Sequence, residues 1–239
     1  KDIGGLALTG VGITMPIMTI IMAFVMLIGI GTSARISLKL GEHKREEAEK
    51  HLGNAFTLII IASVLITIIG LVFMHKILGL FGASADTEIY AREYMQIIFF
   101  GTIFNMLSFG LNHSIRSDGS PKVAMLSMLI GAGTNIILDP IFIFVFGMGV
   151  RGAAIATVIS QIVSTIWILY YFTKGKSNLK IKREYLSLDK AIVLSIFSIG
   201  VSPFSMQIAQ SIVQVLANNA LKTYGGDLAI GAMTIINSV

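Results

Sequence analysis

Long apolar stretches alternate with short polar loops along this chain, and the stretches have the length of membrane spans. A helix needs roughly 20 consecutive apolar residues to cross the hydrocarbon core of a bilayer. Five windows of that length contain no Lys, Arg, Asp or Glu: 3–34, 52–74, 94–115, 152–173 and 191–221. A sixth, 123–150, contains one acid, Asp139, and a seventh begins at Leu228. Because a helix satisfies its own backbone hydrogen bonds in lipid, this pattern predicts an all-α integral membrane protein.

The polar segments between the spans divide the chain. Most are short, but 174–190 is the longest polar stretch and separates five spans from those that follow. We therefore expect a first helical unit over 1–173, a linker over 174–190, and the start of a second unit over 191–239. The charged sequence GEHKREEAEK at 41–50 favours a helix and predicts a helical end that leads into the second span.

The distribution of basic residues predicts which loops face the cytoplasm. The chain has 18 Lys and Arg residues against 13 Asp and Glu residues, a net charge of +5. Of the 18, 13 lie in alternate loops, 35–51, 116–122 and 174–190. Short loops rich in Lys and Arg stay in the cytoplasm. The positive charge therefore indicates orientation in a bacterial plasma (inner) membrane, and no nucleic-acid partner is expected.

The sequence lacks the residues that several kinds of chemistry require. There is no Cys, which excludes disulfides and thiolate metal sites. The phosphate-binding loop GxxxxGK(S/T) is missing, and so is any Ser/His/Asp grouping or pair of acids with catalytic spacing. We expect neither an enzyme nor a cofactor. The chain begins without Met and ends within an apolar run, as expected of a fragment of a longer protein.

An acid inside a membrane span is costly and indicates a functional site. Asp139 is the only acid well inside a span, and Asn135 lies one helical turn before it on the same face. Pro140 cannot donate to the carbonyl of Ile136, which leaves that oxygen free. Together these oxygen atoms form a cluster of the kind that Na⁺ or a proton uses. The alternative is that Asp139 lies near the membrane surface beside a proline kink and is only solvated.

Two other spans carry polar residues on one face. In the fifth, Ala153 and Thr157 belong to a row of small residues that indicates close helix packing, although the Thr157 hydroxyl could also donate to a neighbouring helix. In the sixth, four amides recur every three or four residues and form one polar stripe: Gln207, Gln210, Gln214 and Asn218. The stripe fits a wet cavity for varied solutes, and equally fits hydrogen bonding between helices.

The stretch 116–161 reads RSDGSPKVAMLSMLIGAGTNIILDPIFIFVFGMGVRGAAIATVISQ. It closely resembles the multidrug and toxic compound extrusion (MATE) family, especially the DinF-type bacterial branch. The run TSARISLKLGEHKREEAEKHLGNAF at 32–56 and the run GVSPF at 200–204 resemble the same family. The likeness covers essentially the whole chain.

The resemblance implies twelve helices in two lobes, of which this chain supplies family helices two to seven and the start of eight. It also implies a cation-coupling site at Asn135, Asp139 and Thr157, with the Ala153 carbonyl nearby. The same three side chains would be the metal ligands if the ion is Na⁺. The family's acid on helix one, which belongs to this site, lies outside the chain. Amides such as Gln210 stand where another branch has an acid on helix seven, which disfavours a coupling site there.

The function implied by the resemblance is that of a secondary active antiporter. It would export amphipathic, often cationic drugs and toxins in exchange for H⁺ or Na⁺, as a monomer in the lipid bilayer. One alternative is a flippase for lipid-linked oligosaccharides of the same superfamily, although the spans lack the Lys and Arg residues that a pyrophosphate needs. Another is an intramembrane enzyme or a receptor. An enzyme acting on prenyl diphosphates would need clustered acids for Mg²⁺, and Asp139 is single.

Overall fold

Every regular element that the structure describes is helical. The computed structural model describes residues 4–238, with all side chains except those of residues 228, 237 and 238. In chain order the elements are α1 (Gly5–Gly41), α2 (Arg45–Val72), α3 (Met74–Leu80), α4 (Ala85–Ser117), α5 (Pro121–Pro140), a π-helical turn (Ile141–Val145), α6 (Val150–Thr173), a 3₁₀ turn (Arg183–Tyr185) and α7 (Lys190–Ser238).

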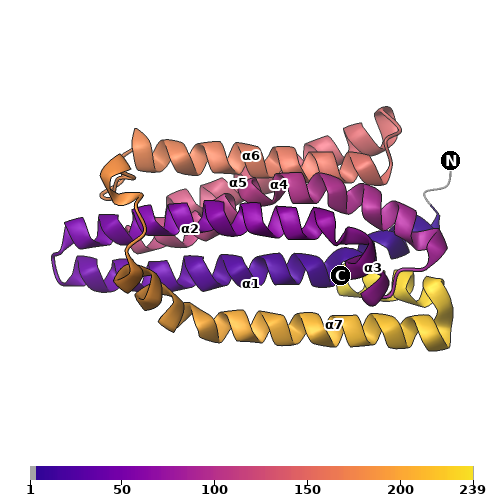
Figure 1. Cartoon of the computed structure of the whole chain (residues 1–239). Helices are drawn as coiled ribbons and strands as arrows, with labels where there is room; N and C mark the ends of the chain where they lie inside the picture. Colours follow the sequence, from indigo (N-terminus) through magenta and orange to yellow (C-terminus); the bar gives the residue numbers. More distant parts are fainter. Residues whose placement is uncertain (1–3, 239) are drawn as a thin grey trace.

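Six of these helices are long and apolar enough to cross a membrane, which confirms the six complete spans predicted from the sequence. They run side by side along one axis (Figure 1). Helices α1, α2, α4 and α7 are longer than their apolar windows because backbone hydrogen bonding continues into their polar ends, whereas α5 with its π-helical turn is shorter than the window 123–150. At 1.5 Å per residue, α1 reaches about 55 Å, against about 30 Å of hydrocarbon. At the start of α4, Ser84 and Thr87 form a reciprocal cap well before the apolar window begins.

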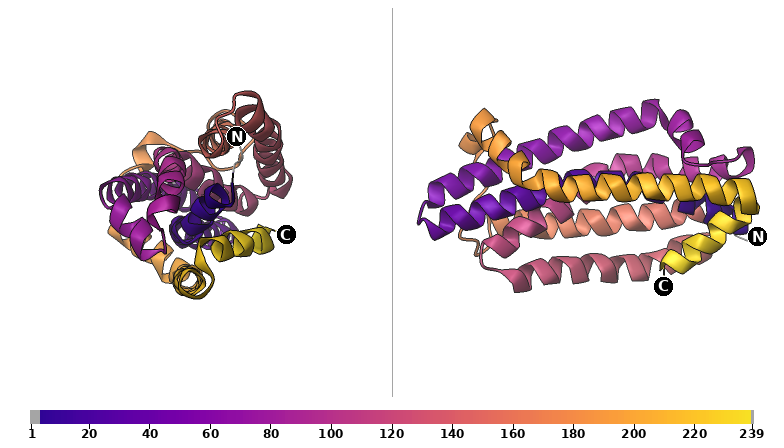
Figure 2. Two further views of the ribbon diagram at one scale, coloured as in Figure 1. Left: turned by 90° about the vertical axis from the view of Figure 1, so that its right-hand side faces the viewer. Right: turned by 90° about the horizontal axis from the view of Figure 1, so that it is seen from below.

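Helix α1 lies near the centre of the bundle, as the end-on view in Figure 2 shows. It packs along α7, α4 and α2, while α5 and α6 form a pair that packs against α4. The backbones of α1 and α7 approach so closely that any side chain at Gly200 would overlap the Leu27 carbonyl oxygen. The buried residues of these helices form one continuous apolar core.

Three local features go beyond the sequence prediction. A short helix, α3, joins α2 to α4, and a π-helical turn follows Pro140. At Gly226, whose φ is 70°, the chain leaves helical geometry and turns back along the bundle (Figure 2). The returning segment contains the seventh apolar run, which we predicted from Leu228. It packs on α1, where Thr234 meets Gly12.

Candidate functional site

The acid of α5 is paired with an amide one turn earlier on the same helix. Asn135 Nδ2 donates to Asp139 Oδ1 over 3.2 Å, and both side chains are half-buried. The apolar Ile136 and Ile137 of α5 are 71% and 65% exposed, so they form its outer surface. Beyond Pro140 the chain continues as a π-helical turn, a rare conformation that is frequent at functional sites.

Helices α4 and α6 add two hydroxyl groups to this carboxylate. Thr157 Oγ1 of α6 donates to the Ala153 carbonyl one turn earlier, over 2.9 Å. The Tyr94 hydroxyl of α4 lies beside the Thr157 hydroxyl and within electrostatic range of the Asp139 carboxylate. The structure therefore places Asn135, Asp139 and Thr157, the three side chains that the family resemblance implies, in one region with Tyr94 beside them, and their role in cation coupling stays a prediction. Sequence reasoning does not identify Tyr94, because only the packing of α4 against α6 places its hydroxyl here.

This cluster presents oxygen atoms of four kinds: a carboxylate, an amide carbonyl, an aliphatic hydroxyl and a phenol. Because the Thr157 proton is given to the Ala153 carbonyl, the lone pairs of the Thr157 hydroxyl stay available. Hard oxygen ligands of this type suit Na⁺, and a lone carboxylate suits a proton equally well. Among residues 4–238 no three His, Cys, Asp or Glu side chains gather as a transition-metal site would require. Binding of a small monovalent cation by this arrangement stays a prediction.

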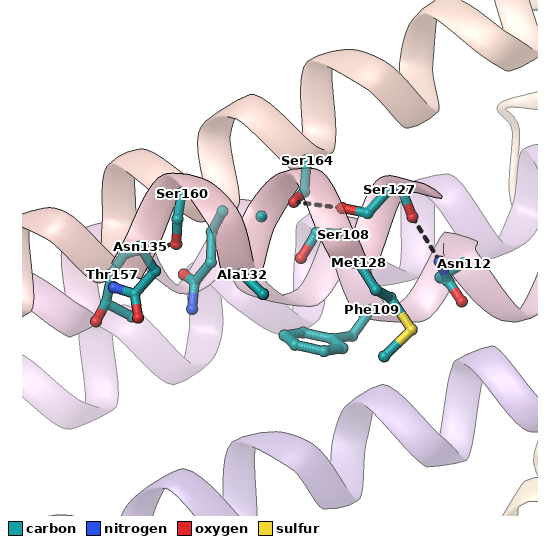
Figure 3. Close-up of a pocket in the computed structure, with 12 residues that line it drawn as sticks. Ser108, Phe109, Asn112, Ser127, Met128, Ala132, Asn135, Thr157, Ser160 and Ser164 are labelled. Carbon is teal, nitrogen blue, oxygen red and sulfur yellow. Dashed lines mark hydrogen bonds between the residues drawn. The ribbon is translucent and has the colours of Figure 1, made fainter. Parts of the chain in front are cut away.

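Beside the cluster, helices α4, α5 and α6 enclose a cavity of about 280 Å³. Figure 3 shows Asn135 and Thr157 at one end and Asn112 and Ser127 at the other. All of the lining residues are uncharged, and Phe109 contributes an aromatic ring: Ser108, Phe109, Asn112, Ser127, Met128, Gly131, Ala132, Asn135, Thr157, Ser160, Gln161 and Ser164. Asn135 and Thr157 therefore belong both to this cavity and to the oxygen cluster formed by Asn135, Asp139, Thr157 and Tyr94.

Hydrogen bonds between the three helices fix the polar wall of this cavity. Asn112 Nδ2 of α4 donates to Ser127 Oγ of α5 over 2.7 Å and to the Ala124 carbonyl over 2.9 Å. Ser164 Oγ of α6 donates to the Ser127 carbonyl over 3.1 Å (Figure 3). The sequence alone assigns no role to Ser127 or Ser164. Their pairing depends on contacts between separate helices, which no local pattern reveals.

The four amides of α7 lie away from this cavity. Gln214 Oε1 accepts a hydrogen bond from a threonine hydroxyl of α1, and Gln207 Nε2 lies 3.4 Å from a methionine sulfur of α1. Asn218 is buried, and its Nδ2 has no hydrogen-bond partner within the part of the chain that the structure describes. Gln210 is exposed. The stripe therefore divides between a face toward the bundle and an exposed side, and its place in a drug cavity stays a prediction.

Known proteins are similar to this chain in sequence and in the arrangement of helices. The MatE family profile matches residues 2–141. "Multidrug export protein MepA" of Staphylococcus haemolyticus is 32% identical over 220 residues, which are 91% of this chain and 48% of the relative. The chain thus spans about half the length of the curated relatives it matches.

Solved structures extend the likeness to three dimensions. The MATE multidrug transporter DinF-BH is 37% identical, with a TM-score of 0.93 over 98% of this chain and 52% of that one. An inward-facing MATE family multidrug resistance transporter of the MOP superfamily is 30% identical, with a TM-score of 0.93 over 97% of this chain and 53% of that one. Together with the six apolar helices, these matches identify a multi-pass membrane protein, and the chain belongs to the MATE family.

Proposed function

We propose that the protein is a secondary active antiporter that exports amphipathic, often cationic compounds in exchange for H⁺ or Na⁺. The observation that carries this proposal is that the oxygen cluster around Asp139 and the cavity have Asn135 and Thr157 in common. The cavity combines uncharged hydrogen-bonding groups with an aromatic ring, which suits varied amphipathic solutes. The names of the relatives, which describe multidrug export, agree with this assignment.

The shared residues supply a physical route for coupling. A cation that binds at Asp139 draws the oxygen atoms of Asn135 and Thr157 toward itself and changes the hydrogen bonds that they offer to the cavity. A ligand shifts a conformational equilibrium only through its different affinities for the two states. Cation binding then favours the state that releases the drug outward, and by reciprocity the drug weakens cation binding. No cofactor is needed.

We further propose that residues 1–173 form helices two to six of an amino lobe, 174–190 the linker, and 191–239 the start of a carboxyl lobe. The protein acts as a monomer, with loops 35–51, 116–122 and 174–190 in the cytoplasm. A flippase for lipid-linked oligosaccharides is the second candidate of the same superfamily. The uncharged lining disfavours it, because a pyrophosphate calls for basic side chains.

The decisive experiment replaces the carboxylate in the complete protein that carries this chain. Asp139→Asn keeps the size and hydrogen bonding of the side chain but removes the charge, so drug efflux should fall by roughly tenfold or more while drug binding is largely kept. Asn135→Ala and Tyr94→Phe, which each remove one neutral group, should reduce efflux less. Efflux is measured with the Na⁺ gradient and the pH gradient collapsed separately, which identifies the ion. Efflux by Asp139→Asn at the wild-type rate with the same gradient would refute this site.

A further inference from the structure

The linker 174–190 is folded onto the end of the bundle that also holds the turn between α1 and α2 (Figure 1). It crosses from the end of α6 to the start of α7 and was expected from its polar sequence to be a simple connection. Instead, two buried carboxylates of the first unit accept hydrogen bonds from it, Asp118 and Glu49, which are 2% and 3% exposed. Buried acids are rare unless they are paired, so each needs an explanation.

Asp118, in the turn between α4 and α5, is surrounded by donors from the α6 end and the linker. The Leu179 N–H donates to Oδ1 over 3.2 Å. Three donors reach Oδ2: the Tyr171 hydroxyl (2.5 Å), the Ser177 hydroxyl (2.8 Å) and the Asn178 N–H (3.1 Å). Bonds to an ionised acceptor are stronger than neutral ones. Asp118 thus binds the first half of the linker through the linker's own backbone.

Glu49, on α2, binds the middle of the linker in the same way. Its carboxylate accepts from the Lys180 N–H over 3.2 Å and pairs with Lys182 Nζ at 2.6 Å. The hydrogen bond to Glu49 raises the pKa of the Lys182 ammonium, so this cation stays charged. Arg45 Nε lies 3.6 Å from Glu49 Oε1, the oxygen that accepts from the Lys180 N–H.

The second half of the linker is bound by two neutral side chains of α2. Asn54 Oδ1 accepts from the Asp189 N–H over 2.8 Å, and Asn54 Nδ2 donates to the Tyr185 carbonyl over 3.4 Å. One turn further along α2, Thr57 Oγ1 donates to the Leu186 carbonyl over 2.7 Å. The backbone of the linker is therefore held at both ends and in the middle by side chains of residues 1–173.

The attachment continues into the first turns of α7. Arg35 Nε of α1 donates to the Ser195 carbonyl over 3.1 Å, and Arg35 Nη2 donates to Ser198 Oγ over 3.3 Å. His51 Nε2 lies 3.3 Å from Ser195 Oγ. Shortly after these contacts comes Pro203, which cannot donate to the carbonyl four residues earlier and so weakens the helix there.

We propose that Asp118 and Glu49 are positioning residues that bind the linker to the amino lobe throughout the transport cycle, while Arg35 and His51 hold the first turns of α7 there. Movement of the carboxyl lobe then begins beyond Ser198, at the weakened part of α7 around Pro203. This inference rests on the proposed antiport, because it assigns the place where the two lobes move relative to one another. The linker behaves as part of the amino lobe and not as a free tether.

The first test measures whether the linker stays bound, and it uses the natural absence of cysteine. Leu179 is fully buried, whereas Ser187 is exposed. In proteoliposomes of the complete protein, membrane-permeant N-ethylmaleimide should label Leu179→Cys roughly tenfold or more slowly than Ser187→Cys, both at rest and during drug transport. Adding Asp118→Asn should raise the Leu179→Cys rate toward that of the exposed site. Equal labelling of both sites at rest, or loss of protection during transport, would overturn the proposal.

A second measurement needs no cysteine in the linker. Trypsin should cleave the linker of Asp118→Asn and Glu49→Gln roughly tenfold faster than that of the wild type, because the local opening free energy falls. Glu47→Gln is the matched control, since Glu47 lies on the same helix but pairs with Lys39 of α1. Equal cleavage of all four proteins would contradict the positioning role.

A third measurement connects the linker to transport. Asp118→Asn and Glu49→Gln should lower the maximal transport rate roughly fivefold or more while leaving drug affinity unchanged, since both residues lie away from the cavity. Glu47→Gln should transport at the wild-type rate. Weaker drug binding in proportion to the lost rate would indicate a general folding defect and refute positioning. Because cleavage, and protection at rest, are measured without transport, failure of the proposed antiport would be recognised separately.

Discussion

The hydrogen bonds between Asn112 and Ser127 offer a quantitative test of what holds α4 against α5. Asn112 is 4% exposed and its amide nitrogen donates two hydrogen bonds to α5. In membrane proteins such bonds average roughly 0.6 kcal/mol each, so Asn112→Ala should lower the free energy of unfolding by about 1.2 kcal/mol. The loss in stability should stay near this value because Ser127 Oγ still donates to the Ala124 carbonyl over 2.8 Å in the variant, so the serine proton remains paired.

The assay is a double-mutant cycle on the complete protein, unfolded reversibly in mixed micelles. Asn112→Ala, Ser127→Ala and the double variant should show a coupling free energy of about 0.6 kcal/mol, the value of the one bond that joins the two side chains. Ser63→Ala on α2 is the control, since its hydroxyl bonds only within its own helix. When Ser63→Ala is combined with Asn112→Ala, the changes in the free energy of unfolding should add to within about 0.3 kcal/mol. A coupling between Asn112 and Ser127 no larger than that of the control pair would refute the reasoning.

Two further predictions address topology and the amides of α7. Cysteine at exposed Ser187 should react with an impermeant maleimide only from the cytoplasm, and cysteine at exposed Ala85 only from outside; the opposite pattern would reverse the proposed orientation. Gln214→Leu should lower protein yield, because it removes an interhelical hydrogen bond to α1, whereas exposed Gln210→Leu should leave yield unchanged and alter the range of exported drugs. Equal effects of both substitutions on yield and on drug range would show that packing does not distinguish these two amides.

The sequence predicts the spans well because each apolar window is a local property. A charge-free stretch longer than the hydrocarbon core has one stable conformation in lipid, whatever its neighbours are. Asn135 and Asp139 could be paired from the sequence for the same reason, since one helical turn separates them. The resemblance of the sequence to a known family then implied Thr157 as a third member, although no local pattern connects Thr157 to these two residues.

Contacts between distant segments could not be predicted. The role of Asp118 leaves no signal in the sequence, because its four donors lie 53–61 residues later in the chain. Tyr94 is one of several aromatic residues in α4, and only the position of α6 distinguishes it from them. The π-helical turn after Pro140 has no signal beyond the proline, which is equally compatible with a kink or a helix end.

The contact between Gly200 and the Leu27 carbonyl makes the seam between α1 and α7 sensitive to a single methyl group. Alanine at this position would force the two backbones apart, and overpacking of that kind costs about 1–3 kcal/mol in whichever conformation keeps the seam closed. In a protein that alternates between two conformations, a cost of this size in one of them changes the ratio of their populations by roughly 5- to 150-fold. Gly200→Ala would therefore favour the conformation in which α1 and α7 are separated at this position. It would shift the conformational equilibrium as a bound ligand does, without contacting drug or ion.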